Sequence, residues 1–234
     1  MIIAIDGPAG SGKSTVASHI ARELGFLKLD TGAMYRAVAL LALECGLDLD
    51  DTEALTELAR SMTIAFEQGA GDVVRILVDG RDVSEEIRTP RVDAVVSRAA
   101  SVAGVRSAML GQQRAAARDH SIVAEGRDIG TVVFPEADLK VFLTADPLER
   151  ARRRVMQRHA GDGLDETDLA DEIERTRASI EERDRHDSEN LAELFGTSLD
   201  ASPDAVLIDS SSMSLDQVVE RVKDLVSRRE EVRV

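Results

Sequence analysis

The stretch GPAGSGKS, from Gly7 to Ser14, decides how the rest of the chain is read. Its form, G-x-x-x-x-G-K-S, is typical of a loop whose backbone N–H groups surround phosphate oxygens. The apolar run MIIAI (residues 1–5) precedes it and predicts a buried strand, while apolar residues between Val16 and Leu24 recur at helical spacing. A strand before the motif and a helix after it distinguish a phosphate-binding loop from a chance glycine-rich turn.

This loop predicts binding of ATP together with Mg²⁺. Its glycines let the backbone turn toward the phosphates, and the following helix adds the positive end of its dipole. We expect the catalytic Lys13 to reach the β- and γ-phosphates and the Ser14 hydroxyl to bind Mg²⁺. The predicted ATP-binding residues are Gly7, Pro8, Ala9, Gly10, Ser11, Gly12, Lys13, Ser14 and Thr15.

Four further apolar runs predict the remaining core strands. They are FLKLD (26–30), SIVAEG (121–126), LKVFLTA (139–145) and AVLIDSS (205–211), and helical patterns separate them. This alternation predicts an α/β fold with a parallel sheet and helices on both faces. Helix starts are marked by Asp146 followed by Pro147, and by Ser214 followed by Gln217.

Residues 62–83 break the alternation. MTIAFE and DVVRILVDG alternate in polarity, and QGAG lies between them as a turn, which predicts an antiparallel hairpin. Helical patterns follow to about residue 118. We therefore expect one domain over residues 1–234, with a lobe inserted at about residues 60–105.

The composition excludes several classes of function. The net charge is −15, with 29 Lys and Arg against 44 Asp and Glu, so nucleic-acid and membrane surfaces are unfavourable partners. With no Trp and one Tyr, the chain has no aromatic platform on which bases could stack. The single cysteine, Cys45, lies in the apolar run ALLALEC, where we expect it to pack in the core. A lone cysteine forms no internal disulfide, which favours a reducing compartment and a cytoplasmic protein.

The arginines indicate a second anionic substrate. A kinase that acts on a phosphorylated acceptor brings two anions together, and arginine side chains offset their repulsion. Five arginines lie between Arg150 and Arg158, directly before AGDGLDE (160–166). They are interpreted either as a solvated helix face or as the root of a closing lid at about residues 150–170. Because the chain lacks the N/T-K-x-D segment of switch GTPases and is too short for a motor, a small phosphoryl-transfer enzyme is favoured.

Four segments give the chain a family resemblance. LDTGAMYR (29–36), VDGRDVSEEIRT (78–89), VAEGRDIGTVVFP (123–135) and RDRHDS (183–188) together resemble bacterial cytidylate kinases of the nucleoside monophosphate kinase family. The match runs over nearly the whole chain. The segment EGRDIGTVVFP and the inserted lobe distinguish this chain from adenylate, guanylate and shikimate kinases.

The resemblance implies a five-stranded parallel core, an enlarged monophosphate-binding insert and an arginine-bearing lid. It also implies a reaction in which ATP and CMP or dCMP give ADP and CDP or dCDP. Position by position, it assigns Arg36 and Arg127 to the acceptor phosphate, Ser97, Arg106 and Asp128 to cytosine, Arg183 and Asp187 to the ribose, Thr31 and Tyr35 to the lining, and Arg153 and Arg154 to the transferred phosphoryl. No catalytic base is required, because the second pKa of a phosphate is about 6 and its oxygen is already ionised.

Several alternatives stay open at this point. Asp128 could instead neutralise Arg127, Asp187 could be an acid on a helix surface, and the four histidines are interpreted as structural or surface residues. We expect a monomer whose partners are its small-molecule substrates. The alternative functions are a kinase for UMP or another small acceptor, and a switch that hydrolyses nucleotide slowly.

One position departs from the family pattern. After R-D-x-x-D-S, the family places an arginine on the acceptor phosphate two residues beyond the serine, and this chain has Asn190 there. Either the phosphate is held by one arginine fewer, or Arg185 or a lid arginine takes its place.

Overall fold

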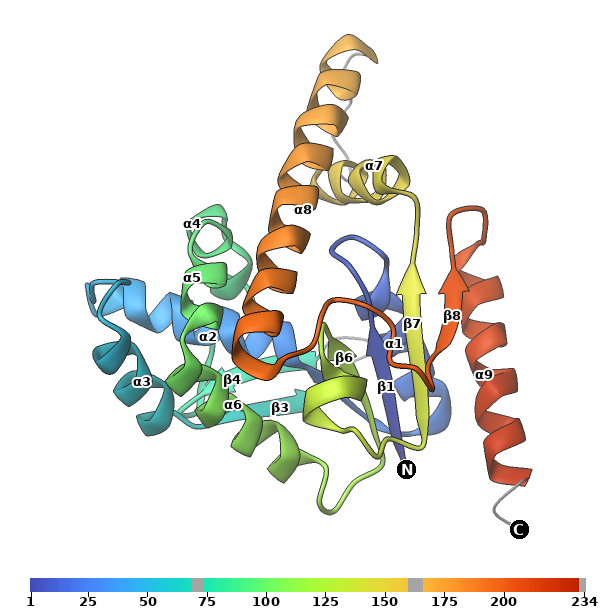
Figure 1. The fold of residues 1–234 in the computed structure, drawn as a ribbon, viewed down its shortest axis with the longest axis horizontal. Helices are drawn as coiled ribbons and strands as arrows, with labels where there is room; N and C mark the ends of the chain where they lie inside the picture. Colours follow the sequence, from blue (N-terminus) through green and yellow to red (C-terminus); the bar gives the residue numbers. More distant parts are fainter. Residues whose placement is uncertain (69–73, 160–165, 232–234) are drawn as a thin grey trace.

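A five-stranded parallel sheet forms the centre of the computed structural model, which describes residues 1–68, 74–159 and 166–231. Its order is β2-β6-β1-β7-β8, and every neighbouring pair is parallel (Figure 1). The strands are β1 (Ile2–Asp6), β2 (Leu27–Asp30), β6 (Ile122–Gly126), β7 (Leu139–Thr144) and β8 (Val206–Asp209). Each coincides with one of the five apolar runs to within two residues at either end, so the α/β fold is confirmed.

Strand β1 shows why helices cover both faces of the sheet. Its residues alternate in direction, and Ile3, Ala4 and Ile5 are all fully buried. Ile3 and Ile5 pack in a core with helices α1 (Lys13–Leu24) and α9 (Leu215–Glu231). Ala4 belongs to the opposite core, which α2 (Thr31–Glu44) and α6 (Ala103–Ala116) complete.

The helix boundaries follow the capping residues. Helix α1 ends at Gly25, whose φ of 66° is left-handed. The Asp146 carboxylate accepts hydrogen bonds from the first turn of α7 (Pro147–Arg158). Ser214 and Gln217 form a reciprocal capping box at the start of α9, so these predicted starts are confirmed.

The predicted hairpin is confirmed as part of a three-stranded antiparallel sheet. Its turn lies mostly outside the described residues. Ile76 and Val78 are buried in the same core as Ala4, so this antiparallel sheet packs on the core of the parallel sheet. The elements here are α3 (Thr52–Ser61), β3 (Ile64–Gln68), β4 (Val74–Val78), β5 (Arg81–Asp82), η1 (Glu86–Arg88), α4 (Pro90–Asp93) and α5 (Val96–Ser101).

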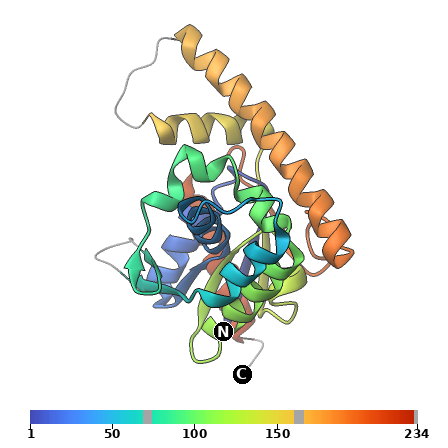
Figure 2. The ribbon, with the colours of Figure 1, turned by 90° about the vertical axis from the view of Figure 1, so that its left-hand side faces the viewer.

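Helix α8 (Glu166–Phe195) is the longest element, with 30 residues. Its first turns lie with α7 beyond the body of the molecule, and the helix returns to the body, where it contacts α5 (Figures 1 and 2). The predicted lid of about 150–170 comprises α7, the start of α8 and residues 160–165, which lie outside the described residues. A short π-helical segment, η2 (Ile129–Val133), follows β6.

The expectation that Cys45 packs in the core is wrong. Cys45 is exposed and lies just beyond the last helical residue of α2. The helix buries Leu40 and Ala42, but the chain turns away at Gly46, whose φ is 63°. The side chain of Cys45 therefore leaves the buried face of the helix. Separately, no helix within the described part of the chain is long and apolar enough to cross a membrane.

Candidate active site

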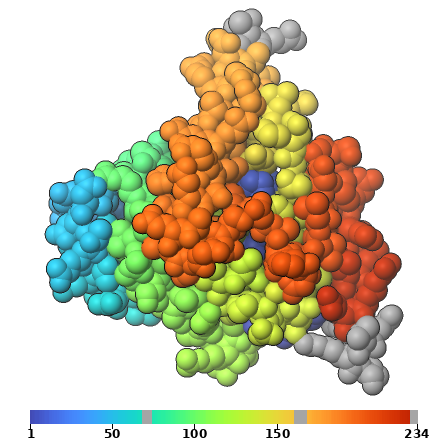
Figure 3. Space-filling model, in the orientation of Figure 1, coloured from blue at the N-terminus to red at the C-terminus, as the bar shows by residue number. Residues whose placement is uncertain are grey.

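A cavity of about 990 Å³ opens beyond the carboxyl ends of β1, β2 and β6. It lies between the phosphate loop and α8, and dark-blue atoms of the N-terminal segment are visible in a hollow there (Figure 3). All the sequence-predicted site residues line it except Gly7 and Pro8, namely Ala9, Gly10, Ser11, Gly12, Lys13, Ser14, Thr15, Thr31, Tyr35, Arg36, Ser97, Arg106, Arg127, Asp128, Arg153, Arg154, Arg183 and Asp187.

The phosphate loop is held in place by its own backbone and by β7. At Gly7 the φ is 148°, and an added Cβ would lie 2.0 Å from the carbonyl oxygen of Leu143. Only glycine fits this approach. The Lys13 ammonium donates to the carbonyl oxygen of Pro8 at 2.7 Å. Burial, together with the charge of Arg127, lowers the pKa of Lys13 to about 8.

A buried lysine on β2 forms hydrogen bonds with the end of the phosphate loop and with the helix that follows it. This residue was not predicted from the sequence. The Lys28 ammonium donates to Ser14 Oγ at 2.7 Å and to Ser18 Oγ at 3.0 Å. It also lies 3.4 Å from Glu125 Oε1. Burial, and then the charge of Asp30, raises the pKa of Glu125. A lysine within the short strand run FLKLD was the available signal, because helices cover both faces of a parallel sheet and leave few of its side chains exposed.

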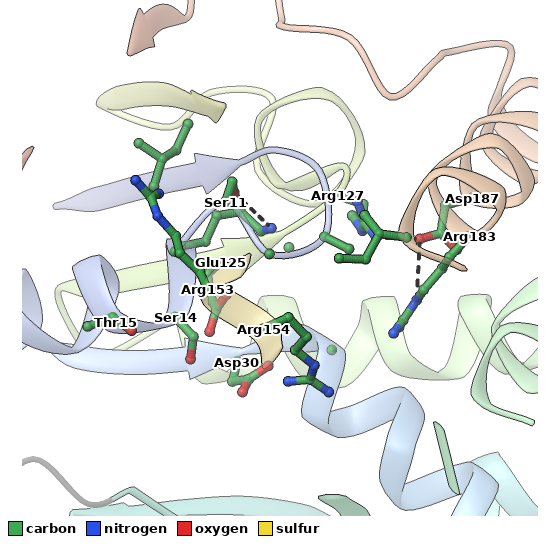
Figure 4. Close-up of a pocket in the computed structure, with 18 of the residues that line it drawn as sticks. Ser11, Ser14, Thr15, Asp30, Glu125, Arg127, Arg153, Arg154, Arg183 and Asp187 are labelled. Atoms are coloured by element: carbon green, nitrogen blue, oxygen red, sulfur yellow. Dashed lines mark hydrogen bonds and ion pairs between the residues drawn. The ribbon is translucent and has the colours of Figure 1, made fainter. Parts of the chain in front are cut away.

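The site has side-chain oxygen atoms that suit Mg²⁺ as ligands, if the phosphates of ATP supply the remaining ligands. A hydroxyl oxygen has two lone pairs, and Lys28 occupies one of those on Ser14. Asp30 and Glu125 line the same part of the cavity (Figure 4). Within residues 1–68, 74–159 and 166–231, no group of three or more His, Cys, Asp or Glu side chains forms a metal cage. Mg²⁺ is commonly held in this way, by few protein oxygens and by substrate phosphates.

On the acceptor side, one carboxylate bridges two of the predicted arginines. Arg36 donates to the carbonyl oxygen of Ile87 at 3.0 Å and to the carboxylate of Asp93. Arg154 Nη2, from α7, lies 3.6 Å from the other oxygen of Asp93. Asp93 therefore joins the arginine of α2 to an arginine of the predicted lid, as an anionic group of a substrate could do.

The two residues predicted to recognise the base form a buried ion pair. Arg106 and Asp128 are 8% and 5% exposed, and the Arg106 guanidinium donates to the Asp128 carboxylate. Burial raises the pKa of Asp128, and Arg106 opposes this effect. The alternative that Asp128 neutralises Arg127 is wrong, because Arg127 instead pairs with Asp184 at 2.7 Å and Asp187 at 2.8 Å.

The predicted ribose pair lies on α8, across the cavity from the phosphate loop (Figure 4). Arg183 Nε and Asp187 Oδ2 are 4.0 Å apart. The side chain of Asp187 is only 15% exposed, so the alternative of an acid on a helix surface is wrong.

Three of the five arginines of α7, Arg150, Arg153 and Arg154, are anchored, whereas Arg152 and Arg158 are exposed on the solvated side of the helix. Arg153 donates to the Ser210 carbonyl oxygen at 2.7 Å. Arg150 is buried and donates to the Ala9 carbonyl oxygen at 2.8 Å and to Asp184 at 2.6 Å.

Asp184 is a second functional residue that the sequence analysis missed. It accepts hydrogen bonds from the Ala9 backbone N–H at 2.9 Å, from Arg127 and from Arg150. It thereby joins α8 to the phosphate loop, to the end of β6 and to α7. The first aspartate within RDRHDS was a signal for it, but the partners of Asp184 are distant in sequence.

Asn190 lines the cavity, and Arg185 does not. The side chain of Arg185 is 64% exposed and pairs with Glu189 at 2.7 Å on the outer side of α8. Of the two proposed substitutes for the missing arginine, the geometry favours a lid arginine, because Arg154 already approaches Arg36 through Asp93.

Comparisons with known proteins place the whole chain in one family. The family model described as cytidylate kinase matches residues 3–228. A cytidylate kinase of Pelotomaculum thermopropionicum is 48% identical over 231 residues, which are 97% of this chain and 97% of that protein. A bifunctional pantoate ligase/cytidylate kinase of Synechococcus is 47% identical over 94% of this chain. This chain spans only 39% of that bifunctional protein.

A solved structure supports the fold alone. The structure of an uncharacterised protein from Eubacterium ventriosum has a TM-score of 0.53 and 13% identity, covering 97% of this chain and 98% of that one. The sequence comparisons confirm the resemblance seen in the motifs.

Proposed function

This chain belongs to the cytidylate kinase family, and on that basis we propose that it transfers the γ-phosphoryl group of ATP to CMP or dCMP. The products are ADP and CDP or dCDP. The observation that carries the proposal is the buried pair of Arg106 and Asp128 in the same cavity as the phosphate loop. A phosphate-binding loop alone is compatible with many acceptors, whereas this pair is suited to one kind of base.

The pair complements the edge of cytosine. Cytosine presents an amino donor and ring acceptors, so a carboxylate and a guanidinium together match it. Arg106 Nε is buried and has no hydrogen-bond partner among the described residues, which leaves a donor for the base. Uracil has a carbonyl in place of the amino group and would face the Asp128 carboxylate with a second acceptor. The Ser97 hydroxyl lines the same part of the cavity.

Transfer requires positioning and charge stabilisation. An oxygen of the CMP phosphate forms a bond to the γ-phosphorus, and the bond from that phosphorus to the leaving ADP oxygen breaks. The acceptor oxygen is ionised near neutral pH, so no side chain has to remove a proton. Lys13, Arg127, Arg153 and Arg154 stabilise the charge on the transferred group. Ser14 would hold Mg²⁺ together with ATP, and the ion would supply positive charge next to the phosphates of ATP.

Closure of the predicted lobe (about 60–105) and lid (about 150–170) would exclude water, which otherwise hydrolyses ATP. Arg153 and Arg154 lie on α7, so closure of this helix would bring their guanidinium groups toward the phosphates. We further propose that the enzyme is a cytoplasmic monomer, as the lone cysteine and the small-molecule substrates suggest.

A coupled assay with ATP and a panel of monophosphates tests the proposal. We expect CMP and dCMP to be far better acceptors than UMP. Asp128→Asn and Ser97→Ala should narrow this difference, because an unpaired buried polar group costs roughly 1–3 kcal/mol. Asp119→Asn removes an exposed carboxylate outside the cavity and serves as the control.

Equal efficiency with CMP and UMP in the unmodified protein would contradict the proposal. Preference for another acceptor would favour a kinase of different specificity. ATP hydrolysis without transfer would favour the switch, although family membership favours neither alternative.

A further inference from the structure

Two of the few aromatic residues contact the same guanidinium group. The chain has five Phe, one Tyr and no Trp. The Arg106 Cζ atom lies 5.3 Å from the centroid of the Tyr35 ring and 5.0 Å from the centroid of the Phe195 ring. Both distances are within the range of cation–π interactions. Tyr35 comes from α2, whereas Phe195 is the last residue of α8.

We propose that Phe195 is a positioning residue for recognition of the pyrimidine base, acting through Arg106. This inference rests on the proposed function. Phe195 does not line the cavity, and its role is to fix the guanidinium that does.

The contacts of Arg106 explain why an aromatic ring suits this role. Its Nη2 donates to Asp128, its Nη1 has one long bond of 3.4 Å to the Ala100 carbonyl oxygen, and its Nε is unpartnered among the described residues. An aromatic face attracts the cation without using an N–H donor. The rings therefore hold the guanidinium while leaving a donor for the base. Without them, ordering this side chain would cost conformational entropy each time substrate binds.

The end of α8 places the ring over Arg106. Gly196 has a φ of 65° and terminates the helix directly after Phe195. Its N–H donates to the Ala192 carbonyl oxygen at 3.0 Å, which keeps the last turn closed. The same helix carries Arg183 and Asp187, which are predicted to hold the ribose. One rigid element thus sets both the ribose position and the arginine that reads the base.

Three substitutions distinguish a role of the Phe195 ring in positioning Arg106 from a role in apolar packing alone. Phe195→Leu keeps an apolar side chain but removes the ring, and Phe195→Trp keeps a ring. Leu207→Ala is the matched control, because Leu207 is a large apolar side chain that is 62% exposed on β8, outside the cavity. Since Phe195 itself is 39% exposed, we expect all three variants to fold.

We expect the substitution of Phe195 to change only the binding of the acceptor nucleotide. In Phe195→Leu, the KM for CMP should rise about tenfold, because a cation–π contact between a buried guanidinium and a partly exposed ring lies between the exposed and the desolvated cases. The preference for CMP over UMP should fall, while kcat and the KM for ATP should stay within about twofold, because the lost interaction acts on binding alone. Phe195→Trp and Leu207→Ala should resemble the unmodified protein. NMR of the Arg106 Nε–H provides a readout without substrate, because the rings should shift its proton signal and Phe195→Leu should remove part of that shift.

The outcomes are distinguishable from failure of the proposed function. If the unmodified protein prefers CMP but Phe195→Leu has the same KM for CMP and the same preference, the inference is overturned and the function stands. It is also overturned if Leu and Trp are equally damaging, or if the Nε–H signal is unchanged. If the unmodified protein does not phosphorylate CMP, both the proposed function and the role in base recognition fail.

Discussion

The Lys13 ammonium is held by the carbonyl oxygen of Pro8, where a bound phosphate would offer it stronger partners. We predict that Lys13→Ala lowers the transfer rate by about 10²–10³ or more, because one donor aimed at developing charge contributes this much. ATP binding to the unmodified protein should weaken as the pH rises through about 8, since the ammonium of Lys13 then loses its proton. Lys13→Ala should lack this pH dependence. Transfer assays and binding titrations from pH 6.5 to about 9.5 measure both effects.

The fold of the Lys13→Ala variant is checked by its thermal midpoint. Near-normal turnover in a folded variant would show that the phosphate loop does not take part in catalysis.

A second prediction concerns Asn190. Asn190→Arg should lower the KM for CMP about fivefold, because a charged hydrogen bond to phosphate exceeds a neutral one by about 1 kcal/mol. The kcat should change little, since the ground state and the transition state gain equally. Cytidine without its phosphate should gain much less affinity, and high salt should reduce the effect.

Arg185→Ala is the matched test of the rival arginine. Because Arg185 faces solvent and pairs with Glu189, we expect this variant to bind CMP normally. Unchanged affinity in Asn190→Arg combined with lost affinity in Arg185→Ala would show that residue 190 does not occupy the family's phosphate position.

Individual site residues differ in how readily the sequence indicates them. The phosphate-loop motif is contiguous and spans nine residues, so Gly7–Thr15 could be located at once, although Lys28 and Asp184 also hold the loop from distant positions. Arg106 and Asp128 required the family resemblance, because they are 22 positions apart and meet only through tertiary packing. Lys28 and Asp184 were missed for the same reason.

At the scale of elements, Asp184 joins α8, α7 and the phosphate loop. Burial alone would raise the pKa of Asp184, but Arg127 and its hydrogen bonds hold this pKa below the ordinary value of 3.8. Its stabilising effect is therefore present above about pH 4 and is lost only as the pH falls through the lowered pKa. We predict that Asp184→Asn decreases the free energy of unfolding by about 3–5 kcal/mol at pH 7, because two arginines lose a buried partner. Chemical denaturation at pH 7 and at low pH measures this difference.

Glu182→Gln, which removes an exposed carboxylate from the same helix, is the control for the Asp184 variant. If Asp184→Asn is as stable as the unmodified protein at pH 7, Asp184 does not hold these elements together.

The elements with a regular pattern of apolar residues were predicted, and the others were not. The five strands are short apolar runs because both faces of a parallel sheet are buried. Helix α8 has charged residues at half of its 30 positions, and its first turns extend beyond the body of the molecule. Its apolar residues therefore show little helical periodicity. Cys45 follows an apolar run but lies past the helix end, where the direction of the chain decides exposure.

At the scale of the whole molecule, the surface and the cavity have opposite charge. The net charge is −15, whereas Lys13, Arg36, Arg127, Arg154 and Arg183 line the cavity. An approaching nucleotide is therefore repelled at long range and bound at short range. Salt screens interactions beyond about 10 Å at 0.1 M and affects partly buried pairs much less.

The last prediction follows from the different ranges of the surface repulsion and the attraction in the cavity. Raising the salt concentration from about 20 to about 150 mM should increase the association rate of a fluorescent ATP analogue and change its dissociation rate less, because screening removes the long-range repulsion first. Stopped-flow fluorescence measures both rates. Reversing two exposed charges outside the cavity, Glu57→Lys on α3 and Asp224→Lys on α9, should reduce the salt dependence without changing kcat. An association rate that falls with salt in the unmodified protein would mean that the arginines of the cavity, and not the acidic surface, dominate the field that a nucleotide meets.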